Sequence, residues 1–385
     1  MRHFTAEERR RRLVDRQFLS LPNRAIPDTI AGLVGLHATD PATPFLSLWA
    51  RHPGFVTTEL EHELYEKRTV VRHLAMRRTL WVVAAGDLPI IQAAASDRVA
   101  TNEHRRLVGD LQKAGIATDG EKWLATACSA VLDHLAQRGP LTSTELRSAL
   151  PEIGGTYDPA PGKPWGGDVP VAPRVLTVLS ARGAIVRGPN EGGWTTSRPR
   201  WAPAVEWLTP GTPPPEPFSA LLQRWLWTFG PATADDVKWW FGTTLTAARK
   251  ALRDIGAAEV DLGAGPGFAL ADDLDDEPEP EPVAALLPGL DVTTMGWFDR
   301  DWYLGGHRSQ VFDRNGNAGP TAWWNGRVVG GWYQDEAAHV HVQLLEDPGR
   351  DGRRALTRRA AELTSWLDGV RIKPRFPSPL SKAAG

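Results

Sequence analysis

Cysteine is nearly absent from the sequence, which contains Cys128 alone among 385 residues. A single cysteine can form neither an internal disulfide nor a metal site built from several thiolates. The sequence therefore excludes disulfide-stapled secreted domains and zinc-ribbon modules. It is compatible with the reducing environment of the cytoplasm.

Long hydrophobic runs are absent as well. No apolar run approaches the roughly 20 residues that a membrane-spanning helix needs. The N-terminal segment MRHFTAEERRRRLVDR lacks the apolar core of a secretory signal and, unlike an organellar targeting peptide, carries acidic residues. Hydrophobic residues make up 42% and charged residues 23%, which is typical of globular proteins. We therefore expect a cytoplasmic protein without a membrane partner.

The usual signatures of cofactor and metal chemistry are also missing. The chain contains no Gly-rich phosphate loop, no dinucleotide fingerprint, no His-Glu-x-x-His and no nucleophile elbow. His339 and His341 share one face of an expected strand, but no third ligand lies nearby in the sequence. Surface or packed positions are therefore favoured for both histidines, and we expect neither a metal nor a cofactor.

Net charge is small, at −2, but the charges are unevenly distributed. The segment DDLDDEPEPEP at 272–282 holds seven carboxylates, and without it the remainder is mildly basic. This distribution permits a basic surface for nucleic acid, although a charge run is more often a solvated face. The arginine-rich stretches are 9–12, 72–78, 105–106, 350–359 and 371–375.

An internal repeat indicates the domain organisation of the middle of the chain. Each copy has a long amphipathic helix, Gly-Pro, and a short second helix (141–150 and 232–240). A third helix then ends at Gly183 or Gly256 and is followed by an apolar strand, a Gly-rich turn and another strand. Ser143 and Thr233 can act as N-caps of the short helices. This order of elements is that of a winged helix.

The flanking regions complete the expected architecture. Before the repeat, helices are expected at 5–18, 27–38, 43–52 and 57–66, followed by two strands, 69–76 and 79–85, that form a wing-like hairpin with Arg77 and Arg78 at its tip. After it, strand-like runs include Asn325-Gly326, the strongest short hairpin signal, and one amphipathic helix covers 352–367.

We therefore expect an α+β chain of three tandem winged-helix domains followed by a small C-terminal β-barrel or sheet that carries one helix. Proline-rich linkers lie at 208–218 and 275–283. The expected domains are 1–115 (a winged helix with extra helices), 116–207, 217–274 and 283–385.

The segment GLHATDPATPFLSLWAR at 35–51 is the candidate site. The helix that begins near Pro27 is expected to end at about Ala38 or Thr39, because Pro41 disfavours a helical conformation at Asp40. Asp40 and Pro41 would then be the N-cap and first residue of the next helix. At such a helix end, His37 and Thr39 can face one cleft and hold a water molecule. The alternative is a packed histidine with a hydrogen-bonded hydroxyl beside it.

Five stretches of the sequence carry a resemblance to a known family. The chain resembles winged-helix DNA-binding proteins of actinobacteria, and among them the bacterial DNA glycosylases of the AlkZ and YcaQ type. These glycosylases excise bulky N7-alkylated purines and unhook interstrand cross-links. The stretches are GLHATDPATPFLSLWAR, VVRHLAMRRTLWVV, LLPGLDVTTMGWFDRDWYLG, PTAWWNGRVVGGW and RFPSPL.

The resemblance implies three tandem winged helices in a C shape and a C-terminal β-domain. It also implies that residues 37–39 occupy the place of a Gln-x-Gln or Gln-x-Asp pair that positions the attacking water. This chain has His37-Ala38-Thr39 there, and it has Trp81 where the family's Arg-x-Thr-Leu-His stretch ends in His.

His37 and Thr39 can still perform the chemistry that the glutamine pair performs in the family. An N7-alkylated purine already carries positive charge and needs no general acid to leave. His37 can accept a proton from water while Thr39 orients that water. Asp40 can stabilise the cationic sugar only if it is not capping a helix.

The expected ligand is double-stranded DNA, bound by a monomer associated with the nucleoid. Arginine forks suit phosphate contacts, and aromatic rings can stack on an exposed base. Each of these residues has a second interpretation, as an ion-paired arginine or a core tryptophan. The expected DNA-binding residues are Arg51, Arg77, Arg78, Thr79, Trp81, Arg300 and Arg375, and Trp297 is a further stacking candidate.

The predicted function is thus a monofunctional DNA N-glycosylase that excises bulky N7-alkylated or cross-linked purines. The alternative is a non-catalytic winged-helix DNA-binding protein or transcription factor. A third reading, in which the winged helices bind protein partners alone, predicts no salt-sensitive DNA binding.

Overall fold

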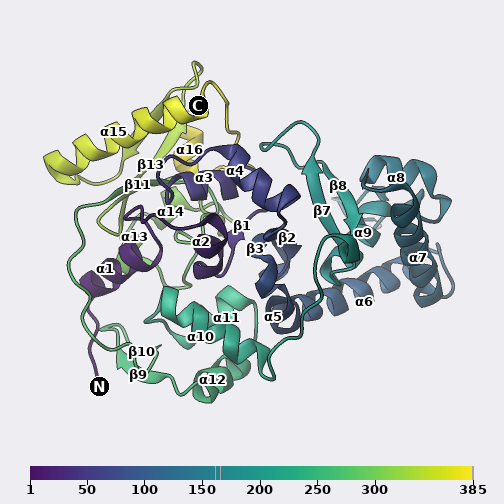
Figure 1. Cartoon of the computed structure of the whole chain (residues 1–385), viewed down its shortest axis with the longest axis horizontal. Coiled ribbons are helices and arrows are strands. Elements are labelled where there is room, and N and C mark those ends of the chain that lie inside the picture. Colours follow the sequence, from purple (N-terminus) through teal and green to yellow (C-terminus); the bar gives the residue numbers. More distant parts are fainter. Residues whose placement is uncertain (161, 165, 384–385) are drawn as a thin grey trace. The chain divides into compact units, whose positions relative to one another are not determined.

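The computed structural model describes residues 1–160, 162–164 and 166–383. The chain divides into two compact units (Figure 1). The larger unit comprises residues 1–60 and 218–385, and the smaller unit comprises residues 61–217. Helices and several small sheets alternate in both, so the expected mixed architecture of helices and small sheets is confirmed. No helix in the described ranges is both long and apolar enough to cross a membrane.

The smaller unit begins with a hairpin. Strands β2 (Val70–Leu74) and β3 (Leu80–Ala84) pair antiparallel with His73 opposite Trp81. The turn between them contains Arg77 and Arg78, whose φ angles are +55° and +61°. A short helix, α5 (Leu88–Ile91), then leads into the longer helix α6 (Asp97–Lys113).

The rest of the smaller unit places three helices against one small sheet. Its strands are arranged in the order β4-β8-β7. Capping of α8 differs from expectation, because the hydroxyl of Thr142, rather than that of Ser143, accepts the N–H of Glu145. The elements are α7 (Gly120–Arg138), β4 (Leu141–Thr142), α8 (Ser143–Ala149), α9 (Ala172–Ala181), β7 (Ile185–Asn190) and β8 (Pro199–Pro203).

One hydrophobic core holds these elements together. It contains Leu111 of α6, Leu135 of α7 and Leu179 of α9, all buried. Helix α9 is buried along most of its length, including Leu176, and packs against α6 and β2. It ends before Gly183, whose φ of +69° suits the glycine expected at that end.

Three of the four helices expected before residue 67 are shorter than expected, whereas helical structure covers the whole of the expected range 57–66 and crosses into the smaller unit. Helix α1 (Ala6–Arg16) begins at a capping box between Thr5 and Glu8. The helix expected at 27–38 is α2 (Ile26–Gly32), so that prediction was too long. Helix α3 (Thr43–Trp49) follows, and α4 (Thr57–Glu61) continues into a π-helical turn at His62–Glu66.

The backbone conformation just after α2 explains why the helix ends earlier than expected. Val34 has φ +58° and Gly35 has φ +110°. The N–H of Gly35 donates to Ile30 and that of Val34 to Ala31, which is the hydrogen-bond pattern of a Schellman cap. The chain then becomes extended in β1 (Leu36–His37). A β-branched residue at positive φ is strained, at roughly 1–3 kcal/mol.

The second repeat copy lies in the larger unit. Helix α11 begins at the expected cap Thr233, and α12 ends before Gly256, which has φ +63°. An isolated bridge joins Ala232 to Phe268, which lies in the second strand of the β9–β10 hairpin. The elements are α10 (Pro217–Phe229), α11 (Ala234–Phe241), α12 (Leu245–Asp254), β9 (Ala258–Asp261) and β10 (Pro266–Ala269).

The C-terminal strands form an open four-stranded sheet in the order β11-β12-β13-β14. Among the described residues no sheet closes into a barrel, so the barrel-like expectation was wrong and the alternative of a sheet holds. The expectation of a single helix was wrong as well, because three short helices accompany the long one in the described part of this region. The Asn325-Gly326 turn joins β12 to β13 with both residues at positive φ, as expected. The strands are β11 (Ala284–Leu287), β12 (Thr321–Trp324), β13 (Arg327–Gln334) and β14 (Val340–Leu344).

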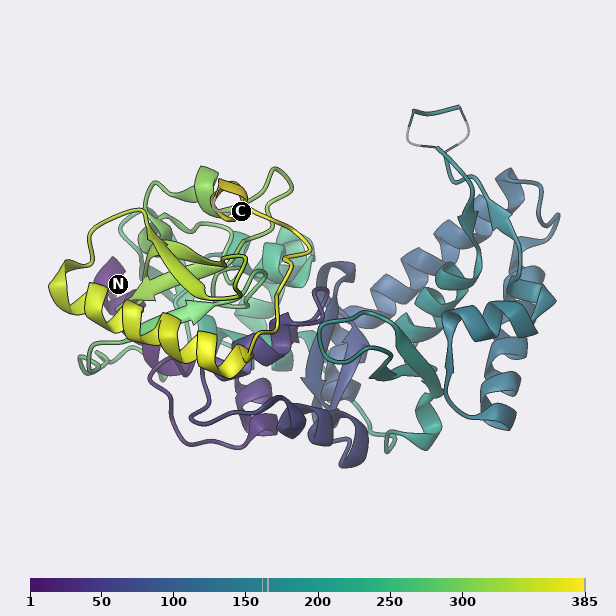
Figure 2. The same ribbon diagram turned by 90° about the horizontal axis from the view of Figure 1, so that it is seen from above.

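Helix α15 (Gly349–Leu367) covers this sheet and contacts β11, β12 and β14 (Figure 2). The remaining short helices of the region are α13 (Asp301–Leu304), α14 (Arg308–Val311) and α16 (Pro379–Ala383).

The acidic segment at 272–282 contacts α1. Arg12 donates to Asp273 at 2.9 Å, and Arg16 donates to Asp273 at 2.7 Å and to Glu277 at 2.9 Å. Arg12 and Arg16 are buried. The carboxylates therefore neutralise arginines within the protein, and this part of the linker expected at 275–283 is bound to α1.

One buried histidine gives the smaller unit a pH-dependent stability. His73 is 2% exposed, its Nε2 lies 2.9 Å from Ser96 Oγ, and burial lowers its pKa from 6.5 to about 4. Between these values the unfolded chain binds the proton more tightly, so stability is full above pH 6.5 and is lost as pH falls toward 4. His73→Gln should remove about 3 kcal/mol of the pH dependence of the unfolding free energy.

Urea unfolding of the wild type and His73→Gln at pH 7 and pH 4.5 measures this difference. His62→Gln is the matched control, because His62 is exposed and paired with Glu66. Equal pH slopes for wild type and His73→Gln would contradict the assignment.

Candidate functional site

The candidate segment lies between two helices, with extended backbone at Leu36–His37 and a bend at Thr39–Asp40. His37 ends β1 and is 4% exposed, whereas Thr39 is half-buried. Because α2 stops at Gly32, the expected frayed helix end is replaced by an extended segment.

Asp40 links this segment to the C-terminal part of the chain. Its Oδ1 accepts the N–H of Ala42 at 3.1 Å, and its Oδ2 accepts the N–H of Arg375 at 3.0 Å. The Arg375 guanidinium also donates to the Thr39 carbonyl at 3.2 Å. Burial raises the pKa of Asp40, while the two N–H groups and the charge of Arg375 oppose that rise.

These bonds give Asp40 a structural role, although it is not the N-cap of the next helix. The expected N-cap was Asp40 itself, but the residue before α3 is Ala42, and Asp40 instead closes the turn that precedes the helix. Both carboxylate oxygens are engaged. Arg375 is exposed, so one of the expected DNA-binding residues does lie against the Thr39–Asp40 segment.

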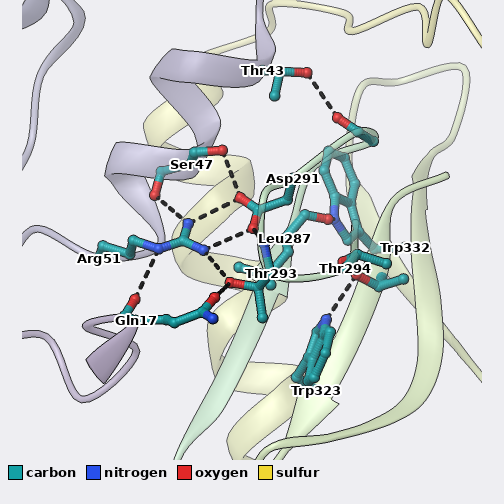
Figure 3. A network of polar contacts seen from close by, with 12 residues as sticks. Gln17, Thr43, Ser47, Arg51, Leu287, Asp291, Thr293, Thr294, Trp323 and Trp332 are labelled. Carbon is teal, nitrogen blue, oxygen red and sulfur yellow. Dashed lines mark hydrogen bonds and ion pairs between the residues drawn. The ribbon is translucent and has the colours of Figure 1, made fainter. Parts of the chain in front are cut away.

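A buried polar network holds α3 to the C-terminal part of the larger unit (Figure 3). Arg51 and Asp291 form an ion pair with both side chains 0% exposed. Arg51 donates to Asp291 at 2.7 and 2.9 Å and to Thr293 at 2.7 Å. Its remaining donors reach the carbonyls of Gln17 and Ser47, at 3.0 and 2.9 Å.

Asp291 is equally well satisfied. It accepts Ser47 Oγ at 2.6 Å and the N–H of Thr293 at 2.9 Å in addition to Arg51. Close by, Thr43 donates to the Gly289 carbonyl at 2.8 Å. The site segment therefore leads directly into a helix whose inner side is fixed by a fully satisfied charge pair.

This geometry corrects the expectation that Arg51 contacts DNA. All five of its N–H donors are used inside the protein, and no side-chain surface remains for a phosphate. Asp291 was not predicted as its partner. The available signal was an aspartate within the otherwise apolar run around LLPGLDV, since a buried carboxylate requires a cation or several donors.

Arg300 and Trp297 are interior residues as well. Arg300 is 3% exposed and stacks on Trp239 and Phe312, each 4.6 Å from its guanidinium carbon, and burial lowers its pKa. Trp297 is 2% exposed and donates to the Phe229 carbonyl at 3.0 Å. Neither side chain presents a surface to DNA, so both expectations were wrong.

The hairpin residues of the smaller unit differ among themselves. Trp81 is 1% exposed and donates to Thr79 Oγ1 at 2.9 Å, so it packs in the interior instead of stacking on a base. Arg78 is exposed and paired with Glu103 at 2.6 Å, and Arg77 is half-buried. Thr79 donates to the Met76 carbonyl at 2.8 Å. Arg77 and Arg78 thus remain at an accessible tip.

No group of three or more potential metal ligands occurs in the part of the chain that the structure describes. His339 and His341 both lie within ion-pair distance of Asp335, at 3.4 and 2.8 Å, and both are exposed.

Comparisons with known proteins agree on one family. The family model described as "DNA glycosylase AlkZ-like" matches residues 30–366. A curated Streptomyces sahachiroi protein, "Interstrand DNA cross-link repair glycosylase", is 30% identical over 178 residues. That match covers 41% of this chain and 45% of the relative, less than half of its length.

A solved structure shares the fold. It is that of Streptomyces sahachiroi DNA glycosylase AlkZ, with a TM-score of 0.70 at 21% identity over 96% of this chain and 98% of that one.

The Arg51–Asp291 pair generates a stability prediction. Arg51→Met leaves an unpaired buried carboxylate and should lower the free energy of unfolding by about 3–5 kcal/mol. The double variant Arg51→Met/Asp291→Leu should recover most of that loss, because no uncompensated charge remains. Urea unfolding followed by tryptophan fluorescence measures both. The control Arg314→Gln, in an exposed turn, should change stability by less than about 0.5 kcal/mol. A single variant as stable as the wild type would contradict the assigned role.

Proposed function

Since the chain belongs to the AlkZ-like DNA glycosylase family, we propose that it releases bulky N7-alkylated or cross-linked purines from DNA by attack of water at the N-glycosidic bond. This membership confirms the resemblance inferred from the sequence motifs. It favours the enzyme over the non-catalytic DNA-binding alternative. The name of the curated relative supports cross-linked DNA as substrate.

The observation that carries the proposal is the polar pair His37 and Thr39 on the segment before α3. The resemblance to the AlkZ and YcaQ type glycosylases implies that these positions match the Gln-x-Gln or Gln-x-Asp pair that positions water there. The chain is extended at His37 and bends at Thr39, so the helical geometry that would point the two side chains to nearly opposite sides is absent.

The proposed chemistry assigns one role to each group. An N7-alkylated purine leaves as a neutral base without a general acid. The imidazole of His37 accepts a proton from the attacking water, and the hydroxyl of Thr39 orients that water. Asp40 acts as a positioning residue, because its oxygens bind backbone N–H groups of Ala42 and Arg375.

The proposed domains follow the repeat. In the second, α7, β4, α8 and α9 precede the β7–β8 pair, which is the winged-helix order, and the third repeats it from α10 to β10. The first would use the β2–β3 hairpin as its wing. The proposed boundaries remain 1–115, 116–207, 217–274 and 283–385.

The proposed ligand is double-stranded DNA, bound by a monomer in the cytoplasm without a cofactor. Arg77, Arg78 and Thr79 at the hairpin and Arg375 beside the site are the proposed contacts. Arg78 and Arg375 are exposed, which supports their assignment as DNA contacts. The planar arginine guanidinium can bind two phosphate oxygens at once.

Base release tests the catalytic assignment. His37→Ala should slow single-turnover release of an N7-alkylguanine from a duplex by about 10²–10⁴-fold, because the proton acceptor is lost. Affinity for the same duplex should be unchanged. Abasic sites are quantified by strand cleavage, and affinity by fluorescence anisotropy.

Matched variants sharpen this experiment. His339→Ala, which removes an exposed histidine, should behave as the wild type. Thr39→Val should slow base release less than His37→Ala does. It removes the hydroxyl that orients the water but leaves the His37 imidazole, which accepts the proton. If His37→Ala retains full activity, the role is assigned to the wrong residue. If the wild type binds DNA but releases no base from several bulky lesions, the enzyme proposal fails.

Asp40 gives a separate prediction for positioning. Asp40→Ala removes the acceptor for Arg375 and Ala42, so the segment that carries Thr39 loses its attachment. Release at saturating protein should fall by about 10²-fold, the size of effect expected from a misplacement of roughly 1 Å. Asp40→Asn retains one acceptor oxygen, so the rate of base release should fall less than in Asp40→Ala. Equal release by Asp40→Ala and wild type would rule out this role.

A further inference from the structure

Helix α15 has two faces of different character. Its buried side, Gly352, Leu356, Ala360, Leu363 and Leu367, packs toward the sheet of the larger unit. Its other side is exposed, and both views show the helix at the periphery of its unit (Figures 1 and 2). The exposed arginines are Arg350, Arg353, Arg354 and Arg358.

These arginines are only partly neutralised. Arg353 pairs with Asp347 at 3.0 Å, and Arg358 lies 3.6 Å from Glu362 in a pair that is exposed on both sides. Such exposed pairs bind weakly. Within the described residues, Arg350 and Arg354 form no ion pair with a carboxylate. Four exposed arginines between 347 and 362 therefore face three carboxylates, and one of these, Glu362, also pairs with the half-buried Arg359 at 2.7 Å.

The order of charges along α15 works against the helix itself. Arg350, Arg353 and Arg354 lie near its N-terminus, where the helix dipole disfavours cations, and the last turn contains no basic residue. Arg350, Arg354 and Arg358 are also spaced four residues apart, so like charges lie next to one another on the surface. Neither solubility nor helix stability accounts for this arrangement, and local conflicts of this kind mark functional surfaces.

We propose that Arg350, Arg354 and Arg358 of α15 bind the phosphate backbone of duplex DNA without regard to sequence. Four helical residues rise about 6 Å, so the row spans about 12 Å. One strand of B-DNA carries roughly three to four phosphates over that length. The choice of DNA over an acidic protein as the ligand rests on the proposed function. The regular spacing of the three arginines supports a ligand whose negative charges are also regularly spaced.

The salt dependence of binding tests the proposal. The slope of log affinity against log salt falls by about 0.9 for each phosphate that the protein no longer neutralises. Arg350→Gln/Arg354→Gln/Arg358→Gln should therefore reduce the slope by about 2.7. The wild type should lose about 40-fold more affinity than the variant between 50 and 200 mM KCl. The probe is an undamaged 40-base-pair duplex followed by fluorescence anisotropy with the full chain.

A charge-retaining control uses the same positions. Arg350→Lys/Arg354→Lys/Arg358→Lys keeps three point charges for phosphate and should keep the wild-type slope. The thermal midpoint of the Gln variant should equal or exceed that of the wild type, because substitution relieves the conflict with the helix dipole. Single-turnover base release at saturating protein should be unchanged, and only the half-saturating protein concentration should rise.

The outcomes separate this proposal from the proposed function. A Gln variant with the wild-type salt slope overturns the role of α15, and so does a wild type without salt-sensitive DNA binding. A salt slope that is reduced in the Gln variant and kept in the Lys variant supports it, even if no base is released. Absence of release with binding intact overturns the glycosylase proposal alone.

Discussion

The buried ion pair between Arg51 and Asp291 is the interaction on which the larger unit depends. It joins three segments that lie far apart in the sequence: the end of α1 through Gln17, the helix α3, and the 291–294 turn. Buried pairs contribute little net stability, because desolvation offsets their attraction. Their effect is on specificity, since a shifted α3 would leave a charge unpaired. One arrangement of the segment that carries His37 and Thr39 is thereby selected.

Two further restraints act on that segment from its ends. At its start, the Schellman cap with Val34 at positive φ turns the chain sharply out of α2. At its end, Asp40 attaches it to Arg375. Strain at Val34 is tolerated because Ile30, Leu33 and Leu36 around it are fully buried. The site is thus held by packing on one side and by backbone hydrogen bonds on the other.

Local signals were predictable from the sequence, and long-range partners were not. The cap at Thr233, the Asn325-Gly326 hairpin and the glycine after α9 each depend on neighbours within a few residues, and all are found. The helix predicted at 27–38 was too long because the apolar pattern of the sequence continues past Val34. Gly35 was the signal that the helix ends earlier. Arg51 and Arg300 look like surface arginines in sequence. Their burial depends on Asp291 and on the rings of Trp239 and Phe312, which only the fold brings near.

The net charge of −2 is a poor guide to DNA binding, because many of the acidic and basic side chains pair within the protein. Asp273 and Glu277 form ion pairs with Arg12 and Arg16 inside the protein. Their opposite charges cancel locally and contribute little to the electrostatic field at a distance. Arg350, Arg353, Arg354 and Arg358 of α15 and the C-terminal Arg375 stay exposed. A phosphate approaching this unit therefore meets local basic surfaces whose strength the total charge conceals, because the field near a surface depends on the charges that remain accessible there.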